Sequence, residues 1–324
     1  MVTLKDIREA QSRIQGIAVR TQLIEACIPQ TSSAQDGRRL YLKPENLQPI
    51  GAFKLRGAYN KIASLSPEER SCGVITYSSG NHGQGVAYAA RALGAKAVIV
   101  MPNNAPAVKR EAAASMGAEI VVVGPGSLER QTRAEELAAQ HGYVIVPPFN
   151  DEKIIAGQGT MGLEILDDLP AVETVLVPVG GGGMLSGVAA AIKLSKPSTK
   201  VIGVEPELAA DAQASLRSGK IVYSSAEQTS QTIADGLRAQ SIGTITFEHI
   251  RRYVDDILTV TEDEIRQAMQ WLATNPKTVA EPSGAVAVAG VLFHRDQLPK
   301  TIMNVAIISG GNVDPQMLQE IRRM

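Results

Sequence analysis

The sequence predicts an α/β protein with two open, twisted, parallel sheets, each covered by helices on both faces. Short β-branched runs alternate along the chain with Ala-rich helical patterns, which is typical of strands joined by crossover helices. One series of runs begins at GVITY and a second at TVLVPV. From this grouping we predict a small α/β domain at residues 69–151 and a large domain made of residues 1–68 plus 152–324.

The elements follow each other in a regular order. The charged and amphipathic N-terminus, MVTLKDIREAQSRIQG, predicts a first helix. In the small domain, the expected strands are GVITY, KAVIVM, EIVVVG and YVIVPP, and the helices between them start near Asn81, at PAVKREAAASM and at SLERQTRAEELAAQ. In the large domain, the strands TVLVPV, KVIGVEP and TIMNVAIIS accompany the helical patterns MLSGVAAAIKL and ELAADAQASL.

Composition excludes several classes of partner. The 324 residues carry 32 Lys and Arg against 33 Asp and Glu, so a net charge of -1 gives no bulk attraction to nucleic acid or to an anionic membrane. No window approaches the roughly 20 apolar residues that cross a bilayer, and the N-terminus lacks the pattern of a secretory signal. We therefore expect a cytoplasmic protein in which Cys27 and Cys72 are free thiols.

A run of four glycines at residues 180–183 separates the apolar strand from the next helical pattern. Without side chains, the backbone N–H groups can converge on one anion at the positive end of the helix dipole. We interpret the run as a phosphate site. The alternative is a flexible linker, although polar residues usually flank linkers. The run matches neither the P-loop nor the GxGxxG pattern, which disfavours a nucleoside triphosphate or a dinucleotide.

Lys54 follows the small and apolar residues of PIGAF and opens a further helical pattern. Partial desolvation there would lower the pKa of its amine, as imine formation requires. Taken alone, however, a lysine is more often a solvated surface charge. The neighbourhood of Lys54 therefore leaves both interpretations open.

The segment YSSGNHGQG follows the strand GVITY and begins a helix, so its hydroxyl, amide and N–H groups can gather round a carboxylate. Ser79 can act there as an acid or a base. The alternative is an N-cap formed by Ser78 or Ser79, with His82 merely packed against its neighbours. The spacing alone favours neither.

Taken together, these motifs resemble a known family. In order along the chain, GAFKLRG, SSGNHGQG, IAGQGT, VPVGGGGM, GVEP, IADGL, EPSGA and IISGGN are similar to segments of the fold type II (β-family) enzymes that use pyridoxal 5'-phosphate (PLP). Within that family the chain resembles the serine/threonine dehydratases and serine racemases, essentially from end to end. The resemblance implies the tryptophan synthase β-like fold.

The resemblance also implies a cofactor site. Lys54 would hold PLP as an internal Schiff base, with Phe53 near the ring, Asn81 at the phenolic oxygen and Ser309 at the pyridine nitrogen. A neutral hydroxyl such as Ser309 does not keep that nitrogen protonated, so the cofactor is a weaker electron sink and prompt β-elimination is favoured. The phosphate would be bound by Gly180, Gly181, Gly182, Gly183 and Met184.

The implied reaction is that of a dehydratase, an ammonia-lyase acting on L-serine or L-threonine, or on threo-3-hydroxyaspartate. The freed Lys54 amine would remove the α-proton, the β-hydroxyl would leave as water, and hydrolysis would give a 2-oxo acid and ammonia. The resemblance implies that the amino-acid substrate is contacted by Ser78, Ser79, Asn81, His82, Arg130, Asp235 and Gly236.

Racemisation is the main alternative. Serine racemases use a serine at the position of Ser79 as a second base, on the face of the substrate opposite the lysine, whereas many threonine dehydratases carry alanine. Two departures weaken this alternative: Phe149 resembles the dehydratases, and Met116 replaces an active-site tyrosine of the mammalian-type racemases. A remote alternative is a non-catalytic protein that binds another phosphorylated ligand.

The segment EPELAAD matches the divalent-metal loop of the racemases. Glu205, the carbonyl of Ala209 and Asp211 would supply hard oxygen ligands suited to Mg²⁺ or Ca²⁺. Without the resemblance, these acids would be ordinary strand-end and helix-cap residues. Glu281 is expected either to line the cofactor cleft or to cap a helix. From the family we also expect a homodimer.

Overall fold

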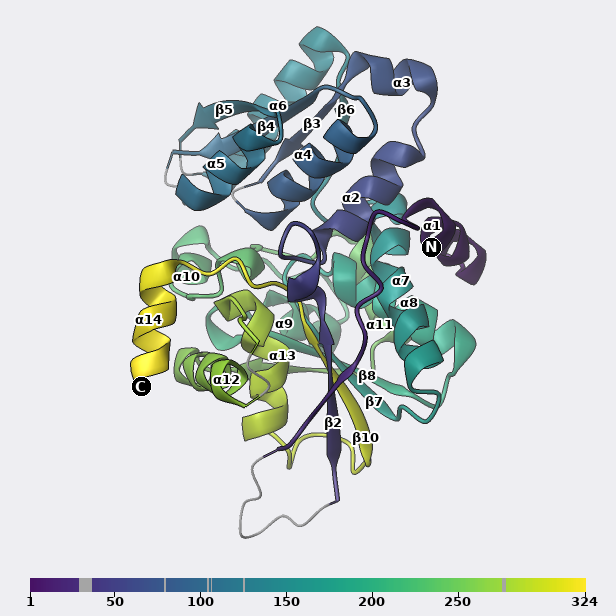
Figure 1. Ribbon diagram of the computed structural model, residues 1–324, viewed down its shortest axis with the longest axis vertical. Helices are drawn as coiled ribbons and strands as arrows, with labels where there is room; N and C mark the ends of the chain where they lie inside the picture. Colours follow the sequence, from purple (N-terminus) through teal and green to yellow (C-terminus); the bar gives the residue numbers. More distant parts are fainter. Residues whose placement is uncertain (29–36, 79, 104, 106, 125, 276–277) are drawn as a thin grey trace.

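Two sheets, one of six strands and one of four, organise the chain (Figure 1). The structure, a computed structural model, describes residues 1–28, 37–78, 80–103, 105, 107–124, 126–275 and 278–324. We call the four-stranded sheet with its helices the small lobe and the rest of the described chain the large lobe. Helix α2 (Lys54–Ala63) lies at the junction between them.

The sheet of the large lobe has the strand order β1-β2-β10-β7-β8-β9. All neighbouring strands are parallel except β1 and β2, which are antiparallel. The last strand along the chain, β10, lies in the middle of the sheet. The strands are β1 (Ile24–Ala26), β2 (Arg39–Pro44), β7 (Thr174–Pro178), β8 (Lys200–Pro206), β9 (Asp256–Val260) and β10 (Met303–Ile308).

Helices cover both faces of this sheet, so successive residues of a strand enter different cores. Leu176 packs with α13 on one face, whereas Val175 and Val177 pack with α8 on the other. Burial on both faces is why the strands are continuous apolar runs. The helices of this lobe are α1 (Leu4–Arg13), α7 (Glu152–Asp168), α8 (Gly183–Ser195), α9 (Asp211–Ser218), α10 (Ala226–Ser230), α11 (Thr244–Tyr253), α12 (Glu262–Thr274), α13 (Pro282–Phe293), α14 (Pro315–Arg323) and the short 3₁₀ turns η1 (Glu45–Leu47), η2 (Glu207–Ala209) and η3 (Asp235–Leu237).

The small lobe repeats this plan on a smaller scale, with the parallel strand order β5-β4-β3-β6. Helices α4 and α5 cover one face, where Ile99 and Met101 are buried, and α6 covers the other, where Val98 and Val100 are buried. The elements, including the connecting helix α3, are α3 (Pro67–Cys72), β3 (Val74–Tyr77), α4 (Asn81–Ala92), β4 (Ala97–Pro102), α5 (Ala107–Ser115), β5 (Glu119–Val123), α6 (Ser127–His141) and β6 (Val144–Ile145).

The predicted fold class is confirmed. Every β-branched run named above forms a strand, and the strands of the smaller sheet lie within residues 69–151. Strands β1, β2 and β9 were not predicted. Where the two domains divide remains a prediction. Both cysteines are free and exposed. Among the described residues, none of the helices is long and apolar enough to span a bilayer.

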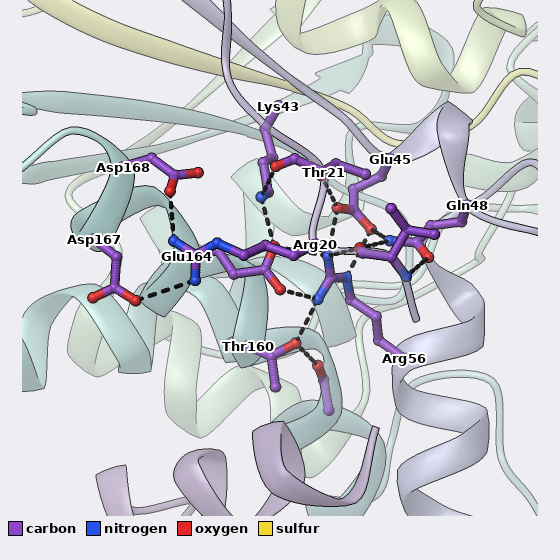
Figure 2. A network of polar contacts seen from close by, with 12 residues as sticks. Arg20, Thr21, Lys43, Glu45, Gln48, Arg56, Thr160, Glu164, Asp167 and Asp168 are labelled. Atoms are coloured by element: carbon purple, nitrogen blue, oxygen red, sulfur yellow. Dashed lines mark hydrogen bonds and ion pairs between the residues drawn. The ribbon is translucent and has the colours of Figure 1, made fainter. Parts of the chain in front are cut away.

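A buried group of charges fixes the base of α2 (Figure 2). Arg56 donates Nε and Nη2 to Glu45, and it donates Nη1 and Nη2 to Glu164 on α7, over distances of 2.7–2.9 Å. Lys43 on β2 donates to the same Glu164 over 2.6 Å. Two cations therefore meet two carboxylates, and none of these side chains is more than 6% exposed. We call these four residues the Arg56 cluster.

The Arg56 cluster matters for α2 because that helix has no side-chain cap at its N-terminus. Burial alone would raise the pKa of Glu45, but the Arg56 guanidinium lowers it below its ordinary value. Arg56 is thus held as a cation between two anions, with a planar fork that fits both. The first turn of α2, where Lys54 lies, is anchored by this side chain two residues further on.

Candidate active site

Lys54 is the first residue of α2, and its Nζ donates to the carbonyl of Pro148 over 2.8 Å. The side chain keeps part of its surface accessible, yet enough protein surrounds the amine that burial lowers its pKa to about 8. This is the direction that its apolar neighbourhood predicts. A lysine of this kind carries a larger neutral, nucleophilic fraction at pH 7 than a solvated one.

Ser309 contacts the residue that precedes this lysine, because the N–H of Phe53 donates to the Ser309 carbonyl over 3.0 Å. The bond ties the start of α2 to the end of β10, and a bridge between Ala52 and Gly310 continues it. Ser309 is buried, and its hydroxyl donates to the carbonyl of Ser283 over 3.2 Å. The structure therefore brings Phe53, Lys54 and Ser309 together.

The glycine run lies between β7 and α8, as predicted. Gly182 is the N-cap of α8 and has φ 89°, a conformation that favours glycine. A Cβ on Gly181 or Gly183 would run into Phe149, and one on Gly182 would lie 2.9 Å from Ile250. The first N–H groups of α8, including that of Met184, have no partner within the helix. This cradle fits the phosphate of a cofactor.

One short segment joins the cradle to the lysine. Pro148 accepts the hydrogen bond from Lys54, and the next residue, Phe149, packs on Gly181. Two residues before Pro148, the carbonyl of Val146 accepts a hydrogen bond from His82. The phosphate cradle, the lysine and the β3–α4 loop thus share the four residues that follow β6.

The β3–α4 loop and the first turn of α4 place Ser78, Asn81 and His82 on the small-lobe side. The N-cap of α4 is Gly80, which forms no side-chain cap, so the capping alternative for Ser78 is wrong. Ser78 Oγ instead accepts from the N–H of Gly80 over 3.2 Å. Ser79 lies outside the described residues.

His82 is buried, and its Nε2 lies 3.0 Å from the Val146 carbonyl. Burial, together with the nearby positive charge of Lys54, lowers the pKa of His82 to about 3. The ring is therefore neutral. Since a carbonyl can only accept, Nε2 carries the proton, and Nδ1 is an acceptor without a hydrogen-bond partner among the described residues.

Asn81 connects the two lobes. Its Nδ2 donates to Glu281 Oε1 through a short hydrogen bond, and its Oδ1 accepts from Asn312 over 2.9 Å. Glu281 has the N-cap position of α13 without making a side-chain cap, so its carboxylate is turned into the site rather than onto the helix. Glu281 therefore does not cap α13 with its side chain, and its place in the cofactor cleft remains a prediction.

Asp235 and Gly236 form part of η3 on the large-lobe side. Gly236 N–H donates to Ser283 over 2.9 Å, and Asp235 Oδ2 accepts from Lys109 over 2.6 Å. Lys109 was not predicted. Its helix carries several charged residues, and nothing in the local pattern separates Lys109 from Arg110 or Glu111.

The remaining predicted residues are more dispersed. Arg130 lies in α6, where burial lowers its pKa, and its part in substrate binding remains a prediction. Met116 packs against the core of the small lobe.

The predicted metal loop runs from the end of β8 through η2 to the first residue of α9. Glu205 accepts from the N–H groups of Ala212 and Gln213, and burial beside Asp211 raises its pKa well above the ordinary value. Burial also raises the pKa of Asp211 to about 7. Asp211 Oδ2 has no hydrogen-bond partner in the described part of the chain, where no group of three or more His, Cys, Asp or Glu residues suited to a metal is present.

A helix N-terminus free of side chains, next to a lysine with a lowered pKa, suits an enzyme that binds a phosphorylated aldehyde through an amine. The profile of the pyridoxal-phosphate dependent enzymes matches residues 17–310, and the chain belongs to this family. The predictions of the family, of fold type II and of a PLP enzyme are confirmed, which sets aside the non-catalytic alternative.

Three relatives illustrate the range of activities among similar chains. The chain is 46% identical to the L-threonine ammonia-lyase of Thermotoga maritima over 321 residues, which cover 99% of this chain and 78% of the relative. It is 42% identical to the L-threo-3-hydroxyaspartate ammonia-lyase of Saccharomyces cerevisiae over 312 residues, 96% of this chain and 94% of the relative. The crystal structure of serine racemase from Dictyostelium discoideum matches with a TM-score of 0.88 and 40% identity, covering 97% and 99% of the two chains.

Proposed function

We propose that the protein is a PLP-dependent ammonia-lyase that converts L-threonine or L-serine into a 2-oxo acid and ammonia. The observation that carries this proposal is the neutral Ser309 hydroxyl, buried beside the helix that carries Lys54. A hydroxyl at the ring nitrogen makes the cofactor a modest electron sink, which favours elimination of the β-hydroxyl over a long-lived carbanion. The ammonia-lyases among the relatives support the same activity.

Each part of the site has a role in this proposal. Bound PLP supplies the electron sink that acidifies the substrate α-carbon. Lys54, with its pKa lowered to about 8, removes the proton at that carbon. Asn81 would hold the ring through its phenolic oxygen. Gly180, Gly181, Gly182, Gly183 and Met184 would hold the phosphate, and Phe149 packs against this run.

We further propose that Ser78, Ser79, Asn81, His82, Arg130, Asp235 and Gly236 bind the amino acid. Because the pKa of His82 is lowered to about 3, this ring would contribute as a neutral hydrogen-bonding group rather than as a cation. The β-substituent stays open among serine, threonine and threo-3-hydroxyaspartate, and the yeast relative supports including the last.

The direct test is incubation of the PLP-loaded protein with each of these three amino acids, with the 2-oxo acid and ammonia measured separately. We expect both products from at least one substrate and none with Lys54→Met. Failure of all three substrates, with and without Mg²⁺, would overturn the proposal.

A second candidate activity is amino-acid racemisation with Ser79 as the second base, which the similarity to a serine racemase favours. Ser79→Ala should then abolish exchange between L- and D-serine while sparing elimination from the L-isomer. Equal loss of both activities would contradict the two-base assignment.

We also propose a divalent cation, Mg²⁺ or Ca²⁺, held by Glu205, Asp211 and the Ala209 carbonyl. The unpartnered Asp211 Oδ2 supports this, because two buried carboxylates without a cation are costly. Mg²⁺ should raise the melting temperature of the wild type but not of Asp211→Asn. Equal shifts in both would place the ion elsewhere.

Two expectations complete the proposal. We expect a homodimer, which sedimentation velocity tests directly. We also expect a cytoplasmic enzyme, with which the two exposed free thiols agree because a reducing compartment maintains them.

A further inference from the structure

Lys109 bridges the two lobes at the site. It lies in the first turn of α5 in the small lobe, and its Nζ donates to Asp235 Oδ2 over 2.6 Å and lies 3.5 Å from Glu281 Oε2. Both carboxylates belong to the large lobe. The Lys109 side chain is only 6% exposed, so this is not a solvated surface pair. We call these three residues the Lys109 bridge.

The bridge also touches the β3–α4 loop. A Cβ built on Gly80 would lie 3.4 Å from Lys109 Cδ and 3.5 Å from its Nζ. The absence of a side chain at Gly80 therefore lets the lysine stem pack along the loop backbone. Lys109 thus packs against the loop that leads into Asn81, the first residue of α4.

A chain of hydrogen bonds continues from the bridge into the site. Glu281 contacts Lys109 through one carboxylate oxygen and Asn81 through the other. Asn81 accepts from Asn312, which also donates to the carbonyl of Ile50 over 2.9 Å. The small lobe is thus connected, through a chain of side chains that ends on a backbone carbonyl, to the segment that leads into Lys54.

The charges make Lys109 necessary for this arrangement. Burial alone would lower the pKa of Lys109, but the facing Glu281 and Asp235 raise it above its ordinary value, so the ammonium stays charged. Without Lys109, the two carboxylates would face each other with no cation between them. Glu281, whose pKa is already raised to about 7 against the opposing effect of Lys109, would then take up a proton, and no ionic contact would hold α5 and the loop against the large lobe.

We infer that Lys109 is a positioning residue for substrate binding, which closes the small lobe against the large lobe and holds the β3–α4 loop where the amino acid binds. This inference rests on the proposed function, because it assigns that loop to the substrate. It does not involve the phosphate cradle or the Lys54 amine, so we expect the protein to retain its PLP without Lys109, although Asn81, which we assign to the phenolic oxygen, is connected to Lys109 through Glu281. Loss of Lys109 lowers the fraction of molecules with a closed site, and the apparent affinity for substrate falls by that fraction.

The test compares Lys109→Met with the wild type, both loaded with PLP, using L-threonine and L-serine. We expect KM to rise by about tenfold with kcat changed less than about threefold, since only substrate capture is weakened. The PLP content should stay unchanged. Lys109→Arg should recover most of the affinity because it restores the cation. Lys109→Gln, which keeps a neutral hydrogen-bond donor at this position, should give an intermediate KM in case Lys109→Met does not fold.

The matched control is Lys193→Met, which breaks an ion pair of equal length, 2.6 Å to Asp255, within the large lobe. This variant should keep the KM of the wild type. A KM for Lys109→Met, or for Lys109→Gln where the first variant does not fold, within about twofold of the wild type would overturn the inference. Loss of PLP in parallel with activity would also overturn it, because Lys109 would then act on the cofactor site.

A second readout separates this inference from the proposed function. Hydrogen exchange of the backbone amides in β3, α4 and α5 should be faster in Lys109→Met than in Lys193→Met, with no substrate present. If no amino acid is turned over, the proposed function fails while this comparison still stands. Equal exchange in the two variants would contradict the bridge itself.

Discussion

The Arg56 cluster and the Lys109 bridge both bury ionised side chains, but they balance charge differently. In the Arg56 cluster two cations meet two carboxylates, and the contacts between Arg56 and its two glutamates are all short. In the Lys109 bridge one ammonium meets two carboxylates, one of them at 3.5 Å. The Arg56 cluster joins α2 to η1, α7 and β2, whereas the Lys109 bridge joins the two lobes.

This difference separates a fixed part of the molecule from an adjustable one. A neutral, fully paired cluster gains nothing from rearrangement, so it suits the base of the helix that carries Lys54. In a bridge with surplus negative charge, the closed and open arrangements are closer in free energy. A bound ligand can therefore shift the equilibrium between them. Three predictions test this contrast, from the largest expected effect to the smallest.

Arg56→Met should cost about 3–5 kcal/mol of unfolding free energy, because it leaves two buried carboxylates with only Lys43 between them. Urea unfolding measures this directly. Arg56→Lys should recover only part of the loss, since an ammonium cannot reproduce the two forked contacts. A loss below about 1 kcal/mol would show that the cluster is no more rigid than a surface pair.

Glu281→Gln should remove a pH dependence of stability. Burial raises the pKa of Glu281 from 4.5 to about 7, with Asp235 adding to the shift and Lys109 and Asn81 opposing it. The folded protein then binds this proton more tightly than the unfolded chain, so stability falls as the pH rises from 4.5 to about 7.

Over that pH interval, the wild type should lose up to about 3 kcal/mol relative to Glu281→Gln. Urea unfolding at several pH values provides the comparison. Parallel curves for the two proteins would mean that Glu281 ionises normally in the folded state and that the bridge is not short of positive charge.

Arg20→Gln should have the smallest effect, below about 1 kcal/mol. Arg20 lies at the edge of the Arg56 cluster (Figure 2) and pairs with Asp168 at 2.5 Å and Asp167 at 3.4 Å, but its side chain is 47% exposed. The same urea assay applies. A loss as large as that of Arg56→Met would extend the rigid region to the surface.

Local sequence patterns predicted the strands well where both faces of a strand are buried. Strands such as Val74–Tyr77 and Thr174–Pro178 are buried on both faces, so their β-branched runs are visible in the sequence. Strand β2 was missed because it mixes apolar residues with Arg39 and Lys43. Lys43 is fully buried, and its ammonium forms an ion pair with Glu164, a residue far along the chain.

The same limit applies to the site. Lys54, the glycine run and Ser309 stand in recognisable motifs, and the structure places Ser309 beside Lys54. Lys109 has no motif of its own, since its role depends on Asp235 and Glu281, which the fold brings to it from two distant segments. A contact between lobes cannot be deduced from a helix that is charged on its own surface.

The central place of β10 has a consequence for how the protein is made. Residues 74–145, which form the smaller sheet, are contiguous and can fold as soon as they leave the ribosome. The larger sheet is incomplete until β10 inserts between β2 and β7. Only then can the N–H of Phe53 donate to the carbonyl of Ser309. We therefore expect the nascent chain to carry an ordered small lobe but no cofactor-binding lysine site until the last part of the sequence has been translated.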